Sequence, residues 1–224
     1  LYNILLLISN LILTKRLFNM TLDSNQSNTT PSLSAVEIEP TQAATASVIW
    51  MHGLGADGND FVDIVGHLNI SLDNVRFIFP HADIMPVTIN NGMEMRAWYD
   101  IKSLDADSLN RVVDVDGINK SLSKVNALID RQIEQGIPSE NILVAGFSQG
   151  GVIASYLAIT SQRKLAGVMA LSTYLPSWDS FKEKVSDTNQ GTPILVCHGT
   201  HDQVLPDVLG KDLSDKLSAH GFAN

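Results

Sequence analysis

The sequence predicts an α/β protein in which a mostly parallel central sheet is flanked by helices. Three observations support this fold class. Short, continuous apolar runs recur along the chain, as in strands that are buried on both faces. Between them lie stretches whose apolar residues recur at helical spacing. One apolar run breaks into Gly-x-Ser-x-Gly and then continues as an apolar helix, which is typical of a sharp strand-turn-helix connection.

The first expected strand, residues 36–38, alternates apolar and acidic residues as a half-exposed edge strand does. The buried strands expected after it are residues 47–51, 75–79, 142–145, 167–171 and 194–197. Helical spacing of apolar residues covers residues 118–133, and Gly136 ends that helix. A further helix follows the serine motif, and another carries residues 208–217. Such alternation gives a layered architecture with right-handed crossovers.

Composition favours one globular domain and excludes some classes of partner. A chain of 224 residues with 44% hydrophobic content can bury one substantial core. The net charge of −9, from 24 acidic and 15 basic residues without a basic cluster, repels nucleic acid and anionic membranes. We therefore expect no nucleic acid partner. The single cysteine, Cys197, permits no internal disulfide, which fits a reducing compartment such as the cytoplasm.

The N-terminal region divides into two segments before the domain. Within residues 1–19, residues 1–13 are almost entirely aliphatic, and Lys15 and Arg16 follow this apolar run. The run is short for a membrane span, and its charges follow the apolar part instead of preceding it as in a secretory signal. We favour Met20 as the natural start and residues 1–19 as leader or upstream sequence, and the expected cytoplasmic location depends on that choice. Residues 20–34 form a flexible polar arm, and residues 35–224 form the domain.

Ser148 is the expected nucleophile. The glycines at positions 146 and 150 leave room for a turn that holds the serine in a strained conformation at the N-terminus of the next helix. The alternative is an ordinary helix start in which Ser148 is only the N-cap residue. The apolar strand before the motif and the apolar helix after it favour the nucleophile.

Acyl transfer also requires two backbone amides that bind the negative charge developing on the carbonyl oxygen. One comes from the residue after the nucleophile, here Gln149, and one from a loop after an early strand. The glycine-rich loop 52–59 follows such a strand and lacks the ending of a phosphate-binding loop, so Leu54 is the second expected donor. The alternative for this loop is a turn that caps the next helix at Asn59 or Asp60.

Asp202 is the expected acid of a catalytic triad, because it follows a strand downstream of the serine. It would hold and orient a histidine base. Two alternatives are a turn cap before Pro206 and a metal site built from His198, His201 and Asp202. The chain shows no further ligand set for a metal, so we expect none.

Four segments in this order resemble the phospholipase/carboxylesterase family, which includes acyl-protein thioesterases: residues 52–59, 79–82 with 95–100, 146–151 and 197–202. The resemblance covers residues 35–224. It implies an α/β-hydrolase that cleaves carboxylic esters or thioesters without a cofactor, acting on small-molecule esters, lipids or acylated proteins. It also implies that Trp98 and the loop 86–95 border the acyl site. The alternative for Trp98 is a core aromatic.

The sequence departs from this family in one respect. The family's base is a histidine after the last strand, and here we expect the last strand and the C-terminal helix to be lacking. His220 is a poor substitute, since it lies at a helix end beside Gly221. We therefore expect an impaired hydrolase, or alternatively a non-catalytic acyl-binding or interaction protein derived from one. Substrate preference and oligomeric state stay open. Cys197 is expected to be a small buried strand residue and not a nucleophile.

Overall fold

The computed structural model describes residues 33–68, 71–104 and 111–224 of the 224-residue chain. The expected leader, residues 1–19, lies outside the described residues, as does nearly all of the expected arm, residues 20–34. Among the described helices, none has the length and apolar character needed to cross a bilayer.

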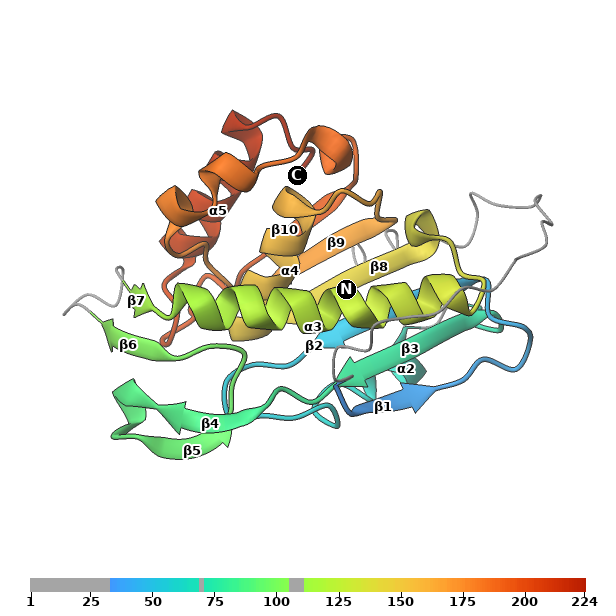
Figure 1. Cartoon of the computed structure of the whole chain (residues 1–224), viewed down its shortest axis with the longest axis horizontal. Helices are drawn as coiled ribbons and strands as arrows, with labels where there is room; N and C mark the ends of the chain where they lie inside the picture. The colour runs from blue at the N-terminus through green and yellow to red at the C-terminus, as the bar shows by residue number, and fades with distance from the viewer. Residues whose placement is uncertain (1–32, 69–70, 105–110) are drawn as a thin grey trace.

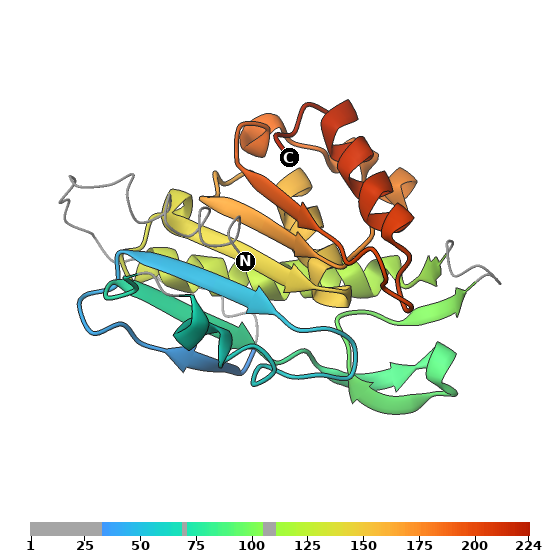
Figure 2. The ribbon, with the colours of Figure 1, turned by 180° about the vertical axis from the view of Figure 1, so that it is seen from behind.

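A six-stranded sheet forms the centre of the molecule, with the strand order β1-β3-β2-β8-β9-β10 (Figures 1 and 2). The strands are β1 (Ala35–Ile38), β2 (Ala46–Met51), β3 (Val75–Pro80), β8 (Ile142–Phe147), β9 (Gly167–Leu171) and β10 (Ile194–Cys197). Only β1 pairs antiparallel, and it lies at the edge of the sheet as expected. The five remaining strands are parallel, so their carboxyl ends meet along one edge. The sequence prediction of a mostly parallel sheet is confirmed.

Helices cover the two faces of this sheet unequally. The helices α3 (Val115–Glu134) and α4 (Gln149–Thr160) pack on one face, in front of the strands in Figure 1 and behind them in Figure 2. The short helix α2 (Ile64–His67) lies on the opposite face, and α5 (Asp207–Ala219) packs beside β10. The described structure also contains five short 3-10 helices: Thr88–Asn90, Ser139–Asn141, Trp178–Ser180, Lys182–Lys184 and Asp187–Asn189.

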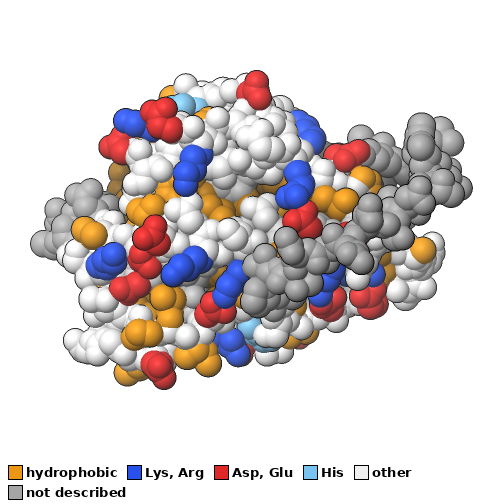
Figure 3. Space-filling view, in the orientation of Figure 1, with side chains coloured by type: hydrophobic (Ala, Val, Ile, Leu, Met, Phe, Trp, Pro, Cys, Tyr) orange, Lys and Arg blue, Asp and Glu red, His pale blue; other side chains and the backbone are white. Residues whose placement is uncertain are grey.

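Apolar side chains from the two faces of the strands build two hydrophobic clusters. The larger one lies under α3 and α4, where α3 buries one stripe that includes Ile118, Val125 and Ile129. The smaller one gathers around Trp50 and Phe77 under α2. The helix α4 is buried almost all round, so its sequence is apolar on every side. On the face that carries α3, acidic and basic side chains are interspersed (Figure 3).

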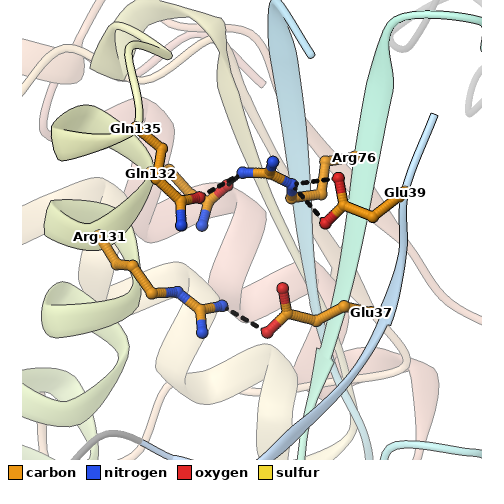
Figure 4. A network of polar contacts seen from close by, with 6 residues as sticks. All are labelled: Glu37, Glu39, Arg76, Arg131, Gln132 and Gln135. Carbon is orange, nitrogen blue, oxygen red and sulfur yellow. Dashed lines mark hydrogen bonds and ion pairs between the residues drawn. The ribbon is translucent and has the colours of Figure 1, made fainter. Parts of the chain in front are cut away.

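Polar side chains fasten the edge strand β1 to the rest of the fold (Figure 4). Arg76 on β3 bonds Glu39 at 2.9 Å and also donates to Gln132 on α3 at 2.9 Å. Arg131 on α3 reaches Glu37 on β1 at 2.7 Å. Partly exposed ion pairs of this kind contribute up to about 1 kcal/mol each. Their main effect is to seat β1 against β3 and α3.

Two hairpins were not expected from the sequence: β4 (Ile84–Val87) with β5 (Met93–Arg96), and β6 (Ile101–Leu104) with β7 (Arg111–Val113). The prediction that residues 86–95 form a loop is therefore wrong. Val87 pairs with Met93, so residues 88–92 connect the two strands, and Asn91 and Gly92 close this loop with φ values of 55° and 74°. Pro86 masked the strand pattern, because proline is tolerated only where a strand needs no donor.

Two local expectations also need correction. No helix begins at Asn59 or Asp60; the amide of Asn59 donates to Asp57 Oδ1 in a turn, and α2 starts at Ile64. Cys197 is a strand residue as predicted, but it is exposed and not buried. It is the last residue of β10, the outer strand of the described sheet.

Candidate active site

The strand β8 ends in a sharp turn that carries Ser148 and leads directly into α4. Ser148 has φ 52° and ψ −116°, a conformation that costs a non-glycine residue roughly 1–3 kcal/mol. The turn closes because its flanking glycines have no side chain. A Cβ on Gly146 would lie 2.2 Å from the carbonyl oxygen of Gly150, and a Cβ on Gly150 would lie 2.6 Å from that of His52. The segment has the geometry of a nucleophile elbow.

Hydrogen bonds to the end of β9 hold this turn in place. The amide of Ser148 donates to the carbonyl of Leu171 at 2.9 Å, and Thr173 Oγ1 donates to the carbonyl of Ser148 at 2.7 Å. Both peptide groups of the strained residue are therefore fixed. The Ser148 side chain is half-buried and lines a cavity.

The loop that follows β2 lies directly against this turn. A Cβ on Gly53 would lie 3.4 Å from Cβ of Ser148, so residues 53 and 54 border the serine. In the described part of the chain, neither the Leu54 amide nor the Gln149 amide donates to a protein carbonyl. Both residues line the cavity beside Ser148. The structure thus brings together the two expected oxyanion donors and the expected nucleophile.

Trp98 lies behind the loop and does not line the cavity. Its side chain is 2% exposed, and its indole Nε1 donates to the carbonyl of His52 at 2.9 Å. Its backbone amide donates to Gln149 Oε1 at 2.8 Å. Trp98 is therefore a core aromatic, as the alternative interpretation predicted. Its indole also holds the loop that follows β2 through the bond to His52.

His52 is buried beneath the same loop and serves it as a structural group. Its Nδ1 donates to the carbonyl of Gly53 at 2.7 Å, and its Nε2 accepts from the amide of Ala82 at 3.0 Å. This assignment follows from the partners, because an amide can bond only to an unprotonated ring nitrogen. Burial lowers the pKa of His52 below its ordinary value of 6.5, which favours this neutral form.

A cavity of about 640 Å³ opens at Ser148. Apolar side chains form most of its wall, and the acidic Asp60 and basic Arg111 lie at its border. Three of the apolar residues, Leu104, Phe147 and Val204, are 41%, 38% and 75% exposed and mark its rim. The full lining is Gly53, Leu54, Ala56, Asp60, Ile89, Ile101, Leu104, Arg111, Phe147, Ser148, Gln149, Tyr174, Gln203, Val204 and Leu205.

Asp202 lies in the loop after β10, and the three residues that follow it border the cavity. Its Oδ1 accepts hydrogen bonds from the amides of Val204 and Leu205, both at 2.9 Å, so the turn-cap alternative describes its present contacts. Its Oδ2 lies 3.7 Å from His198 Nε2. Burial raises the pKa of Asp202. The hydrogen bonds from the amides of Leu205 and Val204, together with the charges nearby, lower it by more, so the pKa lies below its ordinary value.

Comparison with known proteins identifies the family of this chain. The sequence profile of the phospholipase/carboxylesterase family matches residues 33–222. The chain belongs to this family. Acyl-protein thioesterase 1 of Cryptococcus neoformans is 39% identical over 186 residues, which are 83% of this chain and 78% of that protein. Acyl-protein thioesterase 1 of Schizosaccharomyces pombe is 40% identical over 180 residues, covering 80% of this chain and 79% of its own length.

Solved structures confirm the α/β-hydrolase fold expected for a family member. Arabidopsis thaliana SOBER1 superposes with a TM-score of 0.73 at 30% identity, covering 80% of this chain and 85% of that one. Zea mays acyl-protein thioesterase 2 gives a TM-score of 0.71 at 26% identity, covering 85% and 86%. The phospholipase/carboxylesterase family therefore accounts for both the sequence and the fold.

The described structure of this family member brings no histidine to Ser148. All six histidines lie among the described residues, and none lines the cavity: His52, His67, His81, His198, His201 and His220. His198 Nε2 donates to the carbonyl of Leu205 at 2.8 Å. His220 Nδ1 donates to the carbonyl of Lys216 at 2.8 Å, and its ring lies 4.5 Å from that of Trp178. His220 thus occupies the helix end expected from the sequence.

Tyr174 and Arg111 are among the cavity-wall residues that sequence reasoning missed. The Arg111 guanidinium lies 4.9 Å from the centroid of the Tyr174 ring, and its Nη2 donates to the carbonyl of Val204 at 3.2 Å. The Tyr174 hydroxyl lies 2.9 Å from that of Tyr99. Tyr174 follows a strand at the catalytic edge, which was a usable signal. Arg111 belongs to an unexpected hairpin, and no sequence signal placed it there.

Proposed function

We propose that this chain is a serine hydrolase of carboxylic esters or thioesters, and that the reaction passes through an acyl-enzyme on Ser148. The observation that carries the proposal is the strained Ser148, held at the N-terminus of α4 with its side chain bordering a largely apolar cavity. The strain aims the hydroxyl out of the sheet, and the helix N-terminus beside it favours developing negative charge.

In the proposed reaction, Ser148 Oγ attacks the carbonyl carbon of the substrate while a base removes the hydroxyl proton. The amides of Leu54 and Gln149 bind the oxyanion that forms. The tetrahedral intermediate then expels the alcohol or thiol, which takes the proton from the base. Water, deprotonated by the same base, attacks the carbonyl carbon of the acyl-enzyme. The bond to Ser148 Oγ then breaks, the base returns its proton to that oxygen, and the carboxylic acid leaves. Asp202 orients the base and stabilises its charged form.

The base is the part of this mechanism that the described residues do not supply. Each histidine of the chain is engaged away from Ser148, and none borders the cavity. We therefore propose that turnover by the 224-residue chain alone is residual, because an alcohol without a base is a weak nucleophile. The oxyanion donors still contribute, since such groups accelerate acyl transfer without a complete triad.

We propose that the acyl chain of the substrate occupies the cavity. Its apolar wall suits a hydrocarbon chain, and about 0.8 kcal/mol is expected for each methylene buried. The curated relatives are named as acyl-protein thioesterases, which favours acylated proteins or lipids as substrates. Trp98 is proposed to act on this site from behind the loop that follows β2, and not by direct contact with the chain.

Chemical rescue tests the proposal. Added imidazole is small enough to enter a cavity of about 640 Å³ and can replace a missing histidine base. We expect the hydrolysis of acyl thioesters by the chain to rise with imidazole concentration and to lose this enhancement in Ser148→Ala. The control is the imidazole-catalysed rate without protein. An enhancement that survives in Ser148→Ala contradicts the role of Ser148.

The placement of the histidines also favours a second function, a non-catalytic acyl-binding protein derived from a hydrolase. This candidate predicts that fatty acids bind in the cavity while imidazole rescues no turnover. The protein is titrated with fatty acids of increasing chain length, and the same preparation is tested in the imidazole rescue assay. The two measurements together separate the two functions. Saturable binding without any Ser148-dependent hydrolysis supports the binding protein.

A further inference from the structure

We propose that the Gln149 side chain and the Trp98 indole are positioning groups that together fix the two oxyanion amides relative to each other. We call these two groups and the His52 carbonyl the oxyanion clamp. The proposal rests on the proposed function, because it assigns the clamp to the amides of Leu54 and Gln149. It gives the two side chains a role in the chemical step although neither touches the substrate.

The first half of the clamp joins the elbow to the segment that follows β5. Gln149 Oε1 accepts from the amide of Trp98 at 2.8 Å, and Gln149 Nε2 donates to the carbonyl of Tyr99 at 2.7 Å. The side chain thus pairs with two backbone groups about 50 residues away, as a neighbouring strand would. Since Gln149 is 1% exposed, water cannot replace these bonds. The residue whose amide is a proposed oxyanion donor is therefore anchored by its own side chain.

The second half joins the same segment to the loop that carries Leu54. Trp98 Nε1 donates to the carbonyl of His52 at 2.9 Å, and the carbonyl of Arg96 accepts from the amide of Gly55 at 2.9 Å. These bonds hold the loop on both sides of Leu54. The segment 96–99 is therefore bonded to Gln149 and to the residues on both sides of Leu54. In this proposal it sets the distance between the two oxyanion amides.

The chemical reason for such a clamp is the sensitivity of oxyanion stabilisation to geometry. Donors act at about 2.7–3.1 Å from the developing oxyanion, and a displacement of about 1 Å can cost on the order of 100-fold in rate. A loop rich in glycine does not hold a position by itself. The buried bond from Trp98 to His52 on one side of Leu54 and the bond from Gly55 to Arg96 on the other supply the stiffness that the loop backbone lacks.

Another tryptophan of the chain offers a matched control. Trp50 is also 2% exposed, and its Nε1 has no hydrogen-bond partner among the described residues. Trp98→Phe removes a bonded indole N–H and leaves the buried His52 carbonyl unpaired, whereas Trp50→Phe removes an unbonded one. Both changes delete a similar volume from the interior, so their difference reports the hydrogen bond.

The kinetic test compares the two variants in the imidazole-rescued hydrolysis of an acyl thioester. We expect Trp98→Phe to lower kcat about tenfold with KM within about twofold, and Trp50→Phe to change neither by more than about twofold. Equal kcat values in the two variants, or a loss confined to KM, overturn the clamp. Retention of the rescued rate in Ser148→Ala would instead overturn the proposed function, so the two failures are distinguishable.

Gln149→Glu gives a second test with its own signature. An ionised carboxylate cannot donate to the carbonyl of Tyr99, whereas a protonated one can donate there and still accept from Trp98. We expect kcat of this variant, relative to the unsubstituted chain at each pH, to rise as the pH is lowered. A constant ratio across the pH range contradicts the clamp.

Amide hydrogen exchange measures the same feature without any turnover. We expect the amide of Gly55 to exchange at least about tenfold faster in Trp98→Phe than in Trp50→Phe, because its loop loses one anchor. Equal exchange rates in the two folded variants would overturn the proposal whatever the activity of the chain.

Discussion

The two sides of Ser148 are built differently. The proposed oxyanion side comprises residues 52–55, 96–99 and 146–151, and it is bonded across the fold. Its anchoring residues His52, Trp98 and Gln149 are at most 2% exposed, and the three hydrogen bonds of the clamp side chains join residues 46–51 positions apart. The side that carries the proposed acid, residues 198–205, is more open: Asp202 accepts from amides two and three residues away, and Val204 is 75% exposed. Donors that bind charge in the transition state must be fixed beforehand. An acid that orients a partner group requires only a defined loop.

The largest expected difference between the two sides concerns glycine substitution. In Gly146→Ala the new Cβ would lie 2.2 Å from a backbone oxygen, whereas nothing lies within 4 Å of a Cβ on Gly199. We expect Gly146→Ala to lower the free energy of unfolding by about 3 kcal/mol or more, and Gly199→Ala to change it by less than about 0.5 kcal/mol. Urea unfolding followed by circular dichroism measures both. Similar losses in the two variants would contradict the comparison.

Removing the Asp202 carboxylate should have an intermediate effect. Asp202→Ala leaves the amides of Val204 and Leu205 without their acceptor, so we expect the free energy of unfolding to fall by about 1–2 kcal/mol. Asp215→Ala is the control, since Asp215 pairs only with Lys211 among the described residues, at the surface, and its loss should cost less than about 0.5 kcal/mol. Faster amide exchange is expected in residues 203–205 and not in residues 53–55. Exchange that spreads to the oxyanion side would show that the two sides are coupled.

The two sides should also respond to acid in different pH ranges. The folded pKa of His52 lies below 6.5, so the unfolded chain binds the proton first and stability falls as the pH drops from 6.5 toward the folded pKa. The folded pKa of Asp202 lies below 3.8, so its contribution is complete above 3.8 and is lost as the pH falls through the folded value. Denaturant unfolding measured in steps below pH 7 tests the order, with His52→Gln as the variant. The free energy of unfolding of His52→Gln should no longer fall as the pH drops below 6.5. If it still falls as in the unsubstituted chain, groups other than His52 cause the decline.

The smallest effect is expected for the side chain that ties the acid side to β7. Arg111→Met loses the stacking on Tyr174 and the bond to the carbonyl of Val204, which together should cost about 1 kcal/mol. Arg163→Met is the control, because Arg163 pairs with Asp130 at the surface and should cost less than about 0.5 kcal/mol. Thermal unfolding of the two variants gives the difference. If both variants lose the same stability, Arg111 adds nothing beyond an ordinary surface pair.

The sequence predicted the elements whose signal is local. The central strands, the long helix α3, the serine turn and the helix end at His220 follow from apolar periodicity and from glycine placement. It did not predict the hairpins β4–β5 and β6–β7, because Pro86 interrupts one strand pattern and half-exposed strands carry a weak one. It also placed Cys197 in the interior, because a continuous apolar run predicts a buried strand but does not tell whether its last residue is covered.

By itself, the sequence determined that a serine is forced into a strained turn between a buried strand and a buried helix, because the glycines at positions 146 and 150 permit nothing larger at those close contacts. The tertiary structure alone decided how the amides of Leu54 and Gln149 come together and what holds them there. The bonds of Trp98 and Gln149 join segments about 50 residues apart, and no local pattern encodes such a pairing. Buried polar groups find partners across the fold only once the chain has collapsed around them.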